Sequence, residues 1–492
     1  MSLRALFQKA LLLGALQFVP VDSFLEPLRA QEPAALEIKT GGLPIVKEGT
    51  KVTERTVLLR PVIAEVTGTS RLYPTAAERR PGNAAPIILR MNSEANTRRK
   101  TISDLEAKEY YKKSIEEMDA KEIEAAESVL FRSELRRAVF RQSAGWEYPV
   151  FESPHFFILL PDVQDTRFYS RAMNTFARGA ILRNDLSRAE EWLLYANGLA
   201  RHVSETPFAI CRMVAAAEMN DAFNATAELI QHPKATNYYW DLTAIPAPTG
   251  LIHDAVQFET GGWVNTVSAL KDLDAIETEA QWQKLVEEIQ LNLHAMGDSS
   301  FEKKSDYLLL GADWVARSRE QLPVVVPGTD ASSSNMTAAE VSVRYWWNRT
   351  QHFTSLTEAN LLLKPHQALK QLYSTNSSLD PIPDNEKIVK RGVGDLPQRM
   401  FVALTLLEQH LEMLRTIEAI RDWSAKHDGK LPKSLDELSL SIADDPLTGK
   451  PFEWSVTENG KEGVLKGVFP IENGKFFEKA NEIGRIYHIR TE

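Results

Sequence analysis

The strongest constraint on how this chain folds is the helical spacing of apolar residues between Phe168 and Pro248. In the first part of this stretch, apolar side chains recur at every fourth position from Phe168 to Ala180, which places them on one face of a helix. The pattern is interrupted at Asn184-Asp185, Thr206-Pro207, Asn220-Asp221 and Pro233. We therefore predict four short helices that pack as antiparallel neighbours, because their joints span only a few residues.

Capping signals mark where two of these helices are expected to begin. Ser187 and Glu190 form an S-x-x-E pair typical of a capping box, and Thr206-Pro207 places proline at the first helical position. Residues 184–193 look like one tetratricopeptide-type (TPR) hairpin, but the repeat period of a true array does not recur. The sequence thus predicts a mainly α protein, an irregular α-solenoid of TPR-like helical hairpins or a bundle.

The 492 residues are enough for two or three domains, and the chain divides into four parts. Residues 1–30 are predicted to be a signal peptide. Residues 31–100 are predicted to be an irregular N-terminal segment, with residues 57–59 as a short strand or extended chain. Residues 101–398 are expected to form the helical-hairpin domain. Residues 399–492 predict a long amphipathic helix followed by a small antiparallel sheet.

The N-terminus has the outline of a secretory signal peptide. Arg4 and Lys9 precede an almost uncharged run from Ala10 to Val21, and residues 28–30 offer a cleavage site. The run is too short for a membrane span of ordinary length. Cleavage is therefore favoured, with an uncleaved anchor or a buried N-terminal helix as alternatives. We expect export to the periplasm or cell envelope, and no membrane span beyond such an anchor.

Charge and cysteine content narrow the expected partners. The formal net charge is −10 and no basic block or basic-aromatic stripe is evident, so nucleic acid is not expected as a partner. The single cysteine, Cys211, excludes an intramolecular disulfide. It lies among apolar residues, so we predict a packed core thiol rather than a nucleophile.

Two motifs near the C-terminus carry a resemblance to a known family. Residues 429–438, with Gly429, Leu431, Pro432, Ser434, Leu435 and Leu438, match G-x-L-P-x-S-L-x-x-L. Asp445-Pro446, Gly449, Pro451 and Phe452 match D-P-x-x-G-x-P-[FY]. With a long helix before them and a small sheet after them, residues 399–492 resemble the soluble part of type II secretion pseudopilins. The resemblance implies a pseudopilin-like α+β module, although pseudopilins begin with their own hydrophobic helix, whereas this segment is C-terminal and its helix is charged.

The resemblance also suggests a metal site, because the corresponding loop binds calcium in some pseudopilins. Asp444 and Asp445 are then the candidate metal ligands, and calcium is the one cofactor to consider. Calcium takes six to eight oxygen ligands, and the sequence supplies no obvious set. The alternative is that Asp445 starts a turn before proline.

A second resemblance covers most of the chain. It rests on residues 80–85, on residues 237–242 with Pro246 and Pro248, and on the C-terminal motifs. By these residues the mature chain resembles a group of exported helical proteins of planctomycete-type bacteria. This resemblance implies export and a helical fold, and the group has no assigned activity to carry over.

No catalytic constellation is evident, since H-E-x-x-H, paired-cysteine, P-loop and G-x-S-x-G patterns are absent. His253-Asp254 is the nearest approach to a general base with an adjacent acid, but sequence neighbours rarely face each other on a helix. Tyr238, Tyr239 and Trp240 are the candidate ligand- or partner-binding residues, because aromatic side chains with polar tips suit interfaces. The favoured alternative is that they plug the concave side of the helices.

These observations favour a non-catalytic exported helical scaffold or protein-binding module of the cell envelope, with an envelope protein as its partner. Helical-hairpin assemblies commonly present concave surfaces to other proteins. One alternative is an accessory component of a type II secretion or pilus-like apparatus. A third is a hydrolase with a dispersed active site, which predicts a deep polar pocket with convergent histidine and acidic side chains.

Overall fold

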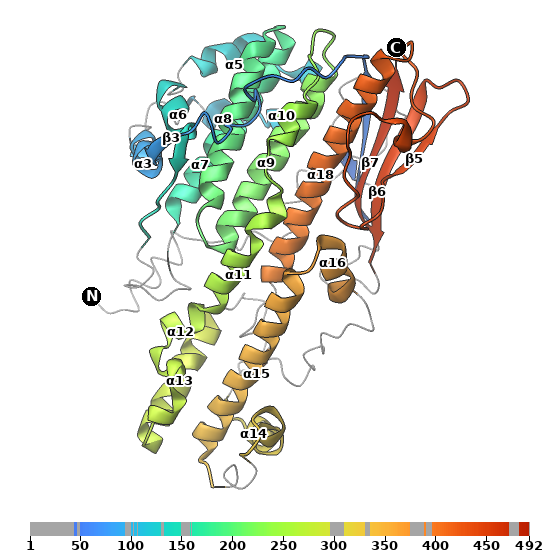
Figure 1. The fold of residues 1–492 in the computed structure, drawn as a ribbon. Helices are drawn as coiled ribbons and strands as arrows, with labels where there is room; N and C mark the ends of the chain where they lie inside the picture. The colour runs from blue at the N-terminus through green and yellow to red at the C-terminus, as the bar shows by residue number, and fades with distance from the viewer. Residues whose placement is uncertain are drawn as a thin grey trace.

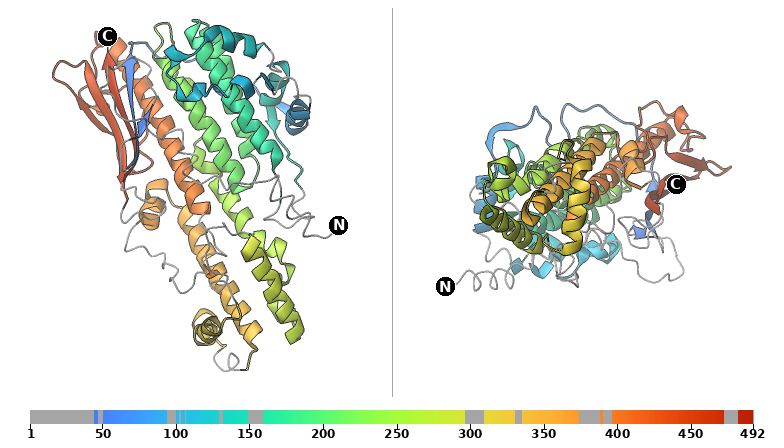
Figure 2. Two further views of the ribbon diagram at one scale, coloured as in Figure 1. Left: turned by 180° about the vertical axis from the view of Figure 1, so that it is seen from behind. Right: turned by 90° about the horizontal axis from the view of Figure 1, so that it is seen from below.

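The computed structural model describes residues 44–46, 50–93, 100–101, 103–105, 107–128, 132–148, 158, 160–295, 309–329, 335–373, 388–389, 396–471 and 482–491. The predicted signal peptide, with its alternative as an anchor, lies outside these residues. Within them the protein consists of a main body, in which helices are flanked by a sheet, and a smaller distal lobe (Figure 1). Figure 2 shows the same elongated outline from behind, and the distal lobe overlying the main body when the molecule is seen from below.

The secondary structure is mainly helical, as the sequence predicts, with a small mixed sheet near the C-terminus. The α-helices are α3 (Ala85–Ser93), α5 (Ala120–Glu127), α6 (Arg132–Val139), α7 (Pro161–Leu182), α8 (Leu186–Ser204), α9 (Ala209–Ile230), α10 (Tyr239–Thr243), α11 (Ile252–Thr260), α12 (Gly262–Thr266), α13 (Glu279–Ala295), α14 (Ala312–Val325), α15 (Ala338–Leu361), α16 (Pro365–Tyr373) and α18 (Leu396–Ala425). The short 3₁₀ helices are η2 (Tyr110–Lys112), η3 (Ile115–Glu117), η5 (Pro248–Leu251), η6 (Ser268–Lys271), η7 (Leu273–Ala275) and η10 (Leu435–Glu437). The strands are β1 (Ile45–Val46), β2 (Lys51–Leu59), β3 (Arg80–Asn83), β4 (Arg141–Ser143), β5 (Glu453–Val456), β6 (Glu462–Pro470) and β7 (Glu482–Thr491).

Helices α7, α8 and α9 pack together at the centre of the main body, in the stretch where four short helices were predicted. The turn between α7 and α8 contains Asn184 in the left-handed conformation, with φ of 60°. Asp185 then caps α8 by accepting a hydrogen bond from the backbone of the first turn. The prediction that Ser187 and Glu190 cap this helix is therefore wrong, and Glu190 accepts a hydrogen bond from a tyrosine hydroxyl instead.

The predicted break at Asn220-Asp221 is also wrong, because α9 continues through both residues. This helix begins after Phe208, two residues later than the Thr206-Pro207 signal indicates. Asparagine and aspartate disfavour helix interiors because their side chains compete for the local backbone. Here Asn220 accepts hydrogen bonds from α18 and β7 instead, so tertiary contacts override the local preference.

The long amphipathic helix predicted at the start of residues 399–492 is present as α18, and it lies between α9 and the sheet. Gly429 follows it with φ of 75° and donates its N–H to the Ser424 carbonyl at 3.0 Å, which closes the C-terminal end. Polar residues of this amphipathic helix are covered as well as apolar ones. Gln409 and Arg421 on this helix are both fully buried, because α9 packs on one side and the sheet on the other.

The sheet joins the two ends of the described chain. Its strand order is β1-β2-β7-β6-β5. Strands β5, β6 and β7 are antiparallel, as predicted, and Gly460 with φ of 68° lies in the hairpin between β5 and β6. Strand β2 pairs in parallel with β7, from Lys51 opposite Ile483 to Leu59 opposite Thr491. Residues 51–59, expected to be mostly irregular, therefore form a nine-residue strand that lies between β1 and β7.

The distal lobe has its own hydrophobic core, built by α12 to α15. Tyr345, Trp346 and Trp347 of α15 are buried in it, and the Trp346 ring contacts that of Trp263 edge-on with centroids 4.9 Å apart. Apolar residues at helical spacing after Thr278 predict a helix, and it is present as α13. They are Trp282, Leu285, Ile289 and Leu293. The lobe is connected to the main body through α11 on one side and through α15, α16 and α18 on the other, and we call this connection the waist (Figure 1).

Candidate functional site

The aromatic segment predicted to bind a ligand or partner is mostly internal. Tyr238 and Tyr239 are 0% and 2% exposed, whereas Trp240 is 37% exposed. The Tyr238 hydroxyl donates to Glu190 at 2.8 Å, and the Tyr239 hydroxyl donates to the Ser441 carbonyl. The three side chains therefore do not form one open surface, and only Trp240 reaches solvent.

Neighbouring polar residues explain why this segment is held inside. The Asn237 amide nitrogen donates to the carbonyls of Val62 at 3.0 Å and Glu418 at 2.9 Å. Asp241, 1% exposed, accepts from the Arg71 guanidinium at 2.6 Å and from the Arg71 backbone. Asn237 and Asp241 thus connect the N-terminal segment to α18, which makes the 237–242 motif a structural junction.

Arg421 extends this junction from the α18 side. It is fully buried and donates to both carboxylate oxygens of Glu418, at 2.8 and 2.9 Å, and to the Arg60 carbonyl at 3.0 Å. Burial raises the pKa of Glu418 to about 7, although the Arg421 charge opposes that rise. These ionisable groups are used to join three chain segments and do not face solvent.

The candidate calcium ligands are also separated by their surroundings. Asp444 is exposed, whereas Asp445 is 1% exposed. The Asp445 carboxylate accepts from the Gln409 amide at 2.9 Å and from the Leu447 N–H at 3.0 Å. These contacts match the turn alternative. Across the part of the chain that the structure describes, no group of three or more histidine, cysteine or acidic residues is placed to hold a metal ion.

A histidine, a tyrosine and an asparagine meet inside the main body between α9, α18 and β7. The Asn220 side-chain oxygen accepts from Arg485 at 2.7 Å and lies 3.0 Å from His410 Nδ1. Because this oxygen can only accept, Nδ1 carries the imidazole proton and Nε2 accepts from the Tyr487 hydroxyl at 2.8 Å. Burial and nearby arginines lower the pKa of His410 well below its usual value. His410 is fully buried and Tyr487 is 2% exposed, so this group of residues does not face solvent.

Cys211 is placed as the sequence predicts. Its side chain is fully buried in a small apolar cluster with Phe208 and Val214. Burial raises the pKa of the Cys211 thiol to about 12, so the reactive thiolate is not formed near neutral pH.

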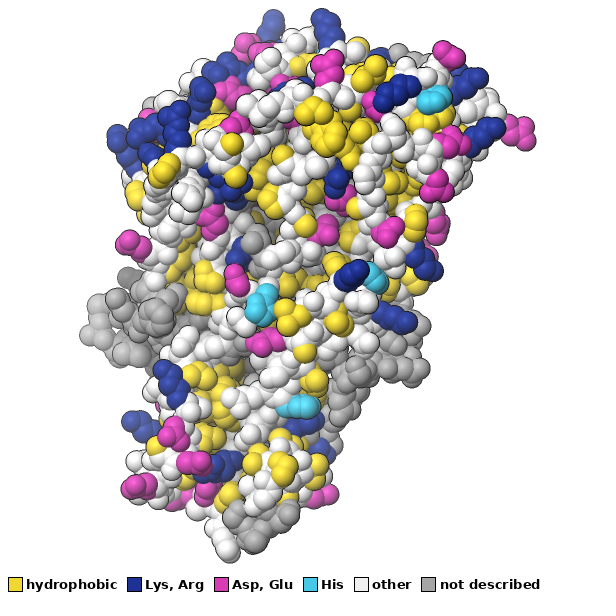
Figure 3. Space-filling view, in the orientation of Figure 1, with side chains coloured by type: hydrophobic (Ala, Val, Ile, Leu, Met, Phe, Trp, Pro, Cys, Tyr) yellow, Lys and Arg dark blue, Asp and Glu magenta, His cyan; other side chains and the backbone are white. Residues whose placement is uncertain are grey.

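The surface feature with the character of a binding site is a hollow of about 200 Å³ at the waist. It is lined by Thr249, Gly250, Ile252, His253, Leu361, Leu362, Leu363, Pro365 and Phe401. Leu362 is 63% exposed and Leu363 is 41% exposed. Hydrophobic side chains are visible among charged ones across this face of the molecule (Figure 3). We call these nine residues the waist hollow.

Polar groups occupy one wall of the waist hollow. Thr249 donates from both its backbone and its hydroxyl to Glu408 of α18. His253 and Asp254 approach to 3.9 Å with side chains 41% and 77% exposed, so they form at most a weak, solvated pair. The lining contains one imidazole and no carboxylate.

Sequence reasoning missed the waist hollow because its residues come from three separate parts of the chain. A local signal was present in Leu361-Leu362-Leu363, where an apolar run ends a helix before Lys364-Pro365. An apolar run at a helix end more often enters the core, and only the fold shows that two of these leucines face solvent.

Comparison with known proteins assigns the chain to no family. No protein-family model, curated protein or solved structure matches the chain. Among the described residues, no helix has the length and apolarity needed to cross a membrane.

Proposed function

We propose that this chain is a non-catalytic, exported helical scaffold of the cell envelope that binds another protein at the waist hollow. The single observation that carries the proposal is the pair of solvent-exposed leucines, Leu362 and Leu363, beside a preformed hollow. Apolar side chains grouped around a concavity are typical of sites where a partner inserts a side chain.

The size of the hollow favours a protein partner over a small substrate. Pockets for small molecules usually measure about 300–1,000 Å³. The waist hollow, at about 200 Å³, accommodates one or two amino-acid side chains. The exposure of Leu362 and Leu363 makes it accessible to an extended or helical segment of a partner.

The chemistry of the interior also favours binding over catalysis. The buried pair of Glu418 and Arg421 bonds to protein atoms that join chain segments. A hydrolase with a dispersed active site needs a general base that faces a nucleophile or water in an open pocket. His253 in the waist hollow has only the weak contact with Asp254.

The proposal also includes TPR-like helical hairpins and a pseudopilin-like C-terminal module. Helices α7, α8 and α9 follow one another with short joints and contact one another, as TPR-like hairpins do. The order of α18, η10, the Asp445 turn and the strands β5 to β7 agrees with a pseudopilin-like module. That order supports a second candidate, an accessory component of a type II secretion or pilus-like apparatus.

The waist proposal is tested by comparing two double variants in a quantitative pull-down from the native envelope fraction. L362D/L363D places charges beside the hollow, and L291D/V324D places them at two exposed apolar positions of the distal lobe. We expect a partner that is captured by wild type and by L291D/V324D but lost at least tenfold with L362D/L363D. Equal recovery of every captured protein by the two variants would contradict binding at the waist.

The remaining parts of the proposal have their own tests. Mass spectrometry of the protein from fractionated cells gives the mature N-terminus, and a cytoplasmic protein with an intact N-terminus would contradict export. Binding to pseudopilins is measured with the whole chain, because residues 399–492 alone would lack the β2 neighbour of β7. Failure of the whole chain to bind any pseudopilin of its own host would remove the second candidate.

A further inference from the structure

Arginines that are far apart in the sequence gather on the side of the main body where α3 and α6 pack together and β3 pairs with β4. Residues 79–93 and 132–143 contain seven arginines, one glutamate and no lysine or aspartate. Figure 3 shows Lys and Arg side chains concentrated at this edge of the molecule. The whole chain has a net charge of −10, whereas these two segments together are positively charged.

The arginines are brought together because strand β4 follows α6 directly and pairs with β3. Helix α6 ends at Val139, and the Phe140 carbonyl accepts from the Arg80 N–H at 2.7 Å. Arg80 and Arg141 are then direct partners in the parallel β3–β4 ladder. Adjacent strands lie about 5 Å apart, so two guanidinium groups project from neighbouring positions.

Four of these arginines have no carboxylate partner in the part of the chain that the structure describes. Arg80, Arg136 and Arg137 are exposed, and Arg141 is half-buried and donates to the Pro81 carbonyl at 2.8 Å. We call these four residues the arginine surface. Arg132, at the start of the same helix, is by contrast paired with Glu191 at 2.5 Å. The arginine surface therefore carries excess positive charge.

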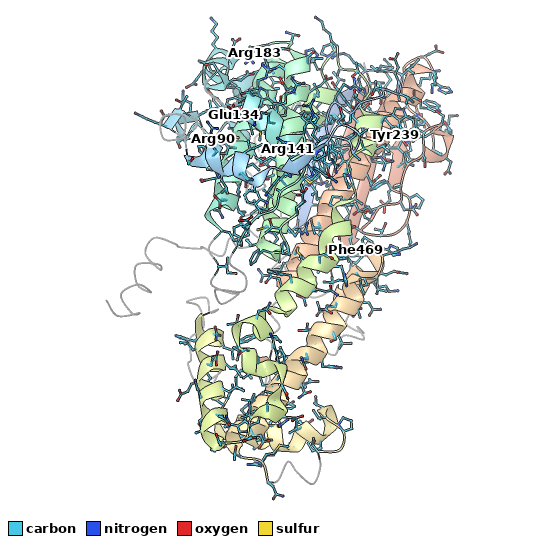
Figure 4. All side chains as sticks on the ribbon, turned by 60° about the vertical axis from the view of Figure 1, so that its left-hand side comes forward. Arg90, Glu134, Arg141, Arg183, Tyr239 and Phe469 are labelled. Atoms are coloured by element: carbon cyan, nitrogen blue, oxygen red, sulfur yellow. The ribbon has the colours of Figure 1, made fainter. Side chains whose placement is uncertain are left out.

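Apolar side chains lie next to this charge on α3. Leu89 is 41% exposed, and Pro86 and Arg90 on the same helix are also exposed. Figure 4 shows Arg90, Glu134 and Arg141 on this side of the main body, with Tyr239 on the other side. A surface helix that presents leucine beside arginine is typical of segments that lie at a membrane interface.

We propose that the arginine surface and the outer face of α3 dock the protein onto an anionic phospholipid bilayer. The guanidinium groups attract the headgroup phosphates, and Leu89 enters the boundary between headgroups and acyl chains. The exposed apolar positions favour a lipid surface over nucleic acid or an acidic protein, because either of those would meet α3 with charged groups. This inference is independent of the waist hollow, which lies elsewhere on the molecule.

The test measures binding of the whole chain to vesicles of phosphatidylcholine with and without phosphatidylglycerol, by flotation. The charge-reversal variant is R136E/R137E. Its matched control is K271E/K284E, which makes the same change in net charge at two exposed lysines of the distal lobe. Wild type and all variants share the same N-terminal segment, so any vesicle binding by that segment is common to them. Vesicles of phosphatidylcholine alone measure that binding.

We expect wild type to bind anionic vesicles in a salt-sensitive manner. We expect R136E/R137E to bind them at least about 25-fold more weakly, since each basic side chain near an anionic bilayer strengthens binding about fivefold and the introduced carboxylates are repelled. K271E/K284E and the charge-preserving R136K/R137K retain binding within about twofold, because the attraction depends on charge at this place. L89S weakens binding without changing its salt dependence.

Equal binding by R136E/R137E and K271E/K284E would overturn the proposal, as would equal binding of wild type to neutral and anionic vesicles. Two further probes distinguish other partners. Binding of wild type to polyglutamate or to duplex DNA, lost in R136E/R137E and unaccompanied by vesicle binding, would also overturn it. Circular dichroism and thermal unfolding of each variant establish that a loss of binding is not a loss of fold.

Discussion

The carboxylate of Glu228 accepts two hydrogen bonds from the guanidinium of Arg178, with N–O distances of 2.6 and 3.0 Å. The side chains of this pair are 4% and 7% exposed. A second guanidinium, that of Arg55 on β2, lies 3.4 Å from the same carboxylate. One buried negative charge on α9 therefore joins α7 to strand β2 of the sheet.

Replacing Glu228 should be among the most destabilising single changes in the main body. E228A leaves Arg55 and Arg178 buried without a counter-charge, which costs about 3–5 kcal/mol of unfolding free energy. E453A removes the exposed ion pair with Lys466 and should cost less than about 1 kcal/mol. Urea unfolding followed by circular dichroism measures both, and similar losses for the two variants would contradict the role of Glu228.

Glu218 should make the protein less stable as pH rises. Burial raises the pKa of this carboxyl group to about 8, although the charge of Arg167 opposes that rise. In the unfolded chain the pKa is close to 4.5, so between pH 4.5 and 8 the folded state holds one more proton than the unfolded state. The stabilisation that the protonated Glu218 gives the folded state is therefore fully present below pH 4.5 and is lost as the pH rises toward 8.

The isosteric variant E218Q isolates this effect. Between pH 5 and 8, the unfolding free energy of wild type should fall relative to E218Q by up to about 1.4 kcal/mol per pH unit. E218Q should be the more stable protein at pH 8. The comparison of the two proteins cancels most of the contribution of other titrating groups, such as His410. Parallel pH profiles for wild type and E218Q would show that Glu218 is ionised in the folded protein.

Gly198 should be required where α8 contacts α6. A Cβ atom at this position would lie 2.3 Å from Val139 Cγ1. Alanine normally stabilises a helix interior by about 1 kcal/mol relative to glycine. We nevertheless expect G198A to destabilise the protein by about 1–3 kcal/mol through overpacking.

A double-mutant cycle tests the cause of that loss. In the V139A background the methyl groups that clash are absent, so G198A should cost much less there. G68A is the control, because nothing lies within 4 Å of a Cβ atom at Gly68. An equal cost of G198A in both backgrounds would mean that the contact with Val139 is not responsible.

Asp445 should contribute to stability without calcium. D445A leaves the Gln409 amide and the Leu447 N–H without their acceptor, at a cost of about 1–3 kcal/mol. D444A, at an exposed position, should be nearly neutral. The thermal midpoint of wild type should not change when calcium or a chelator is added. A calcium-dependent rise that D445A abolishes would support a metal site instead.

Sequence periodicity predicted elements well where one helix face decides their position. Helix α13 is an example, because Trp282, Leu285, Ile289 and Leu293 share a face and are all buried. Short sequence signals for helix breaks were less reliable. Asn220 and Asp221 form a break signal within any short window, but in the fold they lie in the middle of α9, where Asn220 bonds to residues of other elements.

The sheet and the candidate sites show where sequence reasoning ends. A parallel pair such as β2 and β7 has no turn between its strands, so no local pattern indicates that Lys51 faces Ile483. The candidate aromatic residues were identified as a unit, but burial of Tyr238 and exposure of Trp240 depend on what packs against each one. The waist hollow and the arginine surface are both assembled from segments that are distant in the chain.

The pairing of β2 with β7 has a consequence for biogenesis. Strand β2 is translated long before β7, so the ribosome must synthesise all of the intervening chain before these two strands can pair. Until then β2 has an unpaired edge, which is prone to pairing with other chains. A chaperone that holds the nascent N-terminal region, or transport of the chain before it folds, would keep that edge from aggregating.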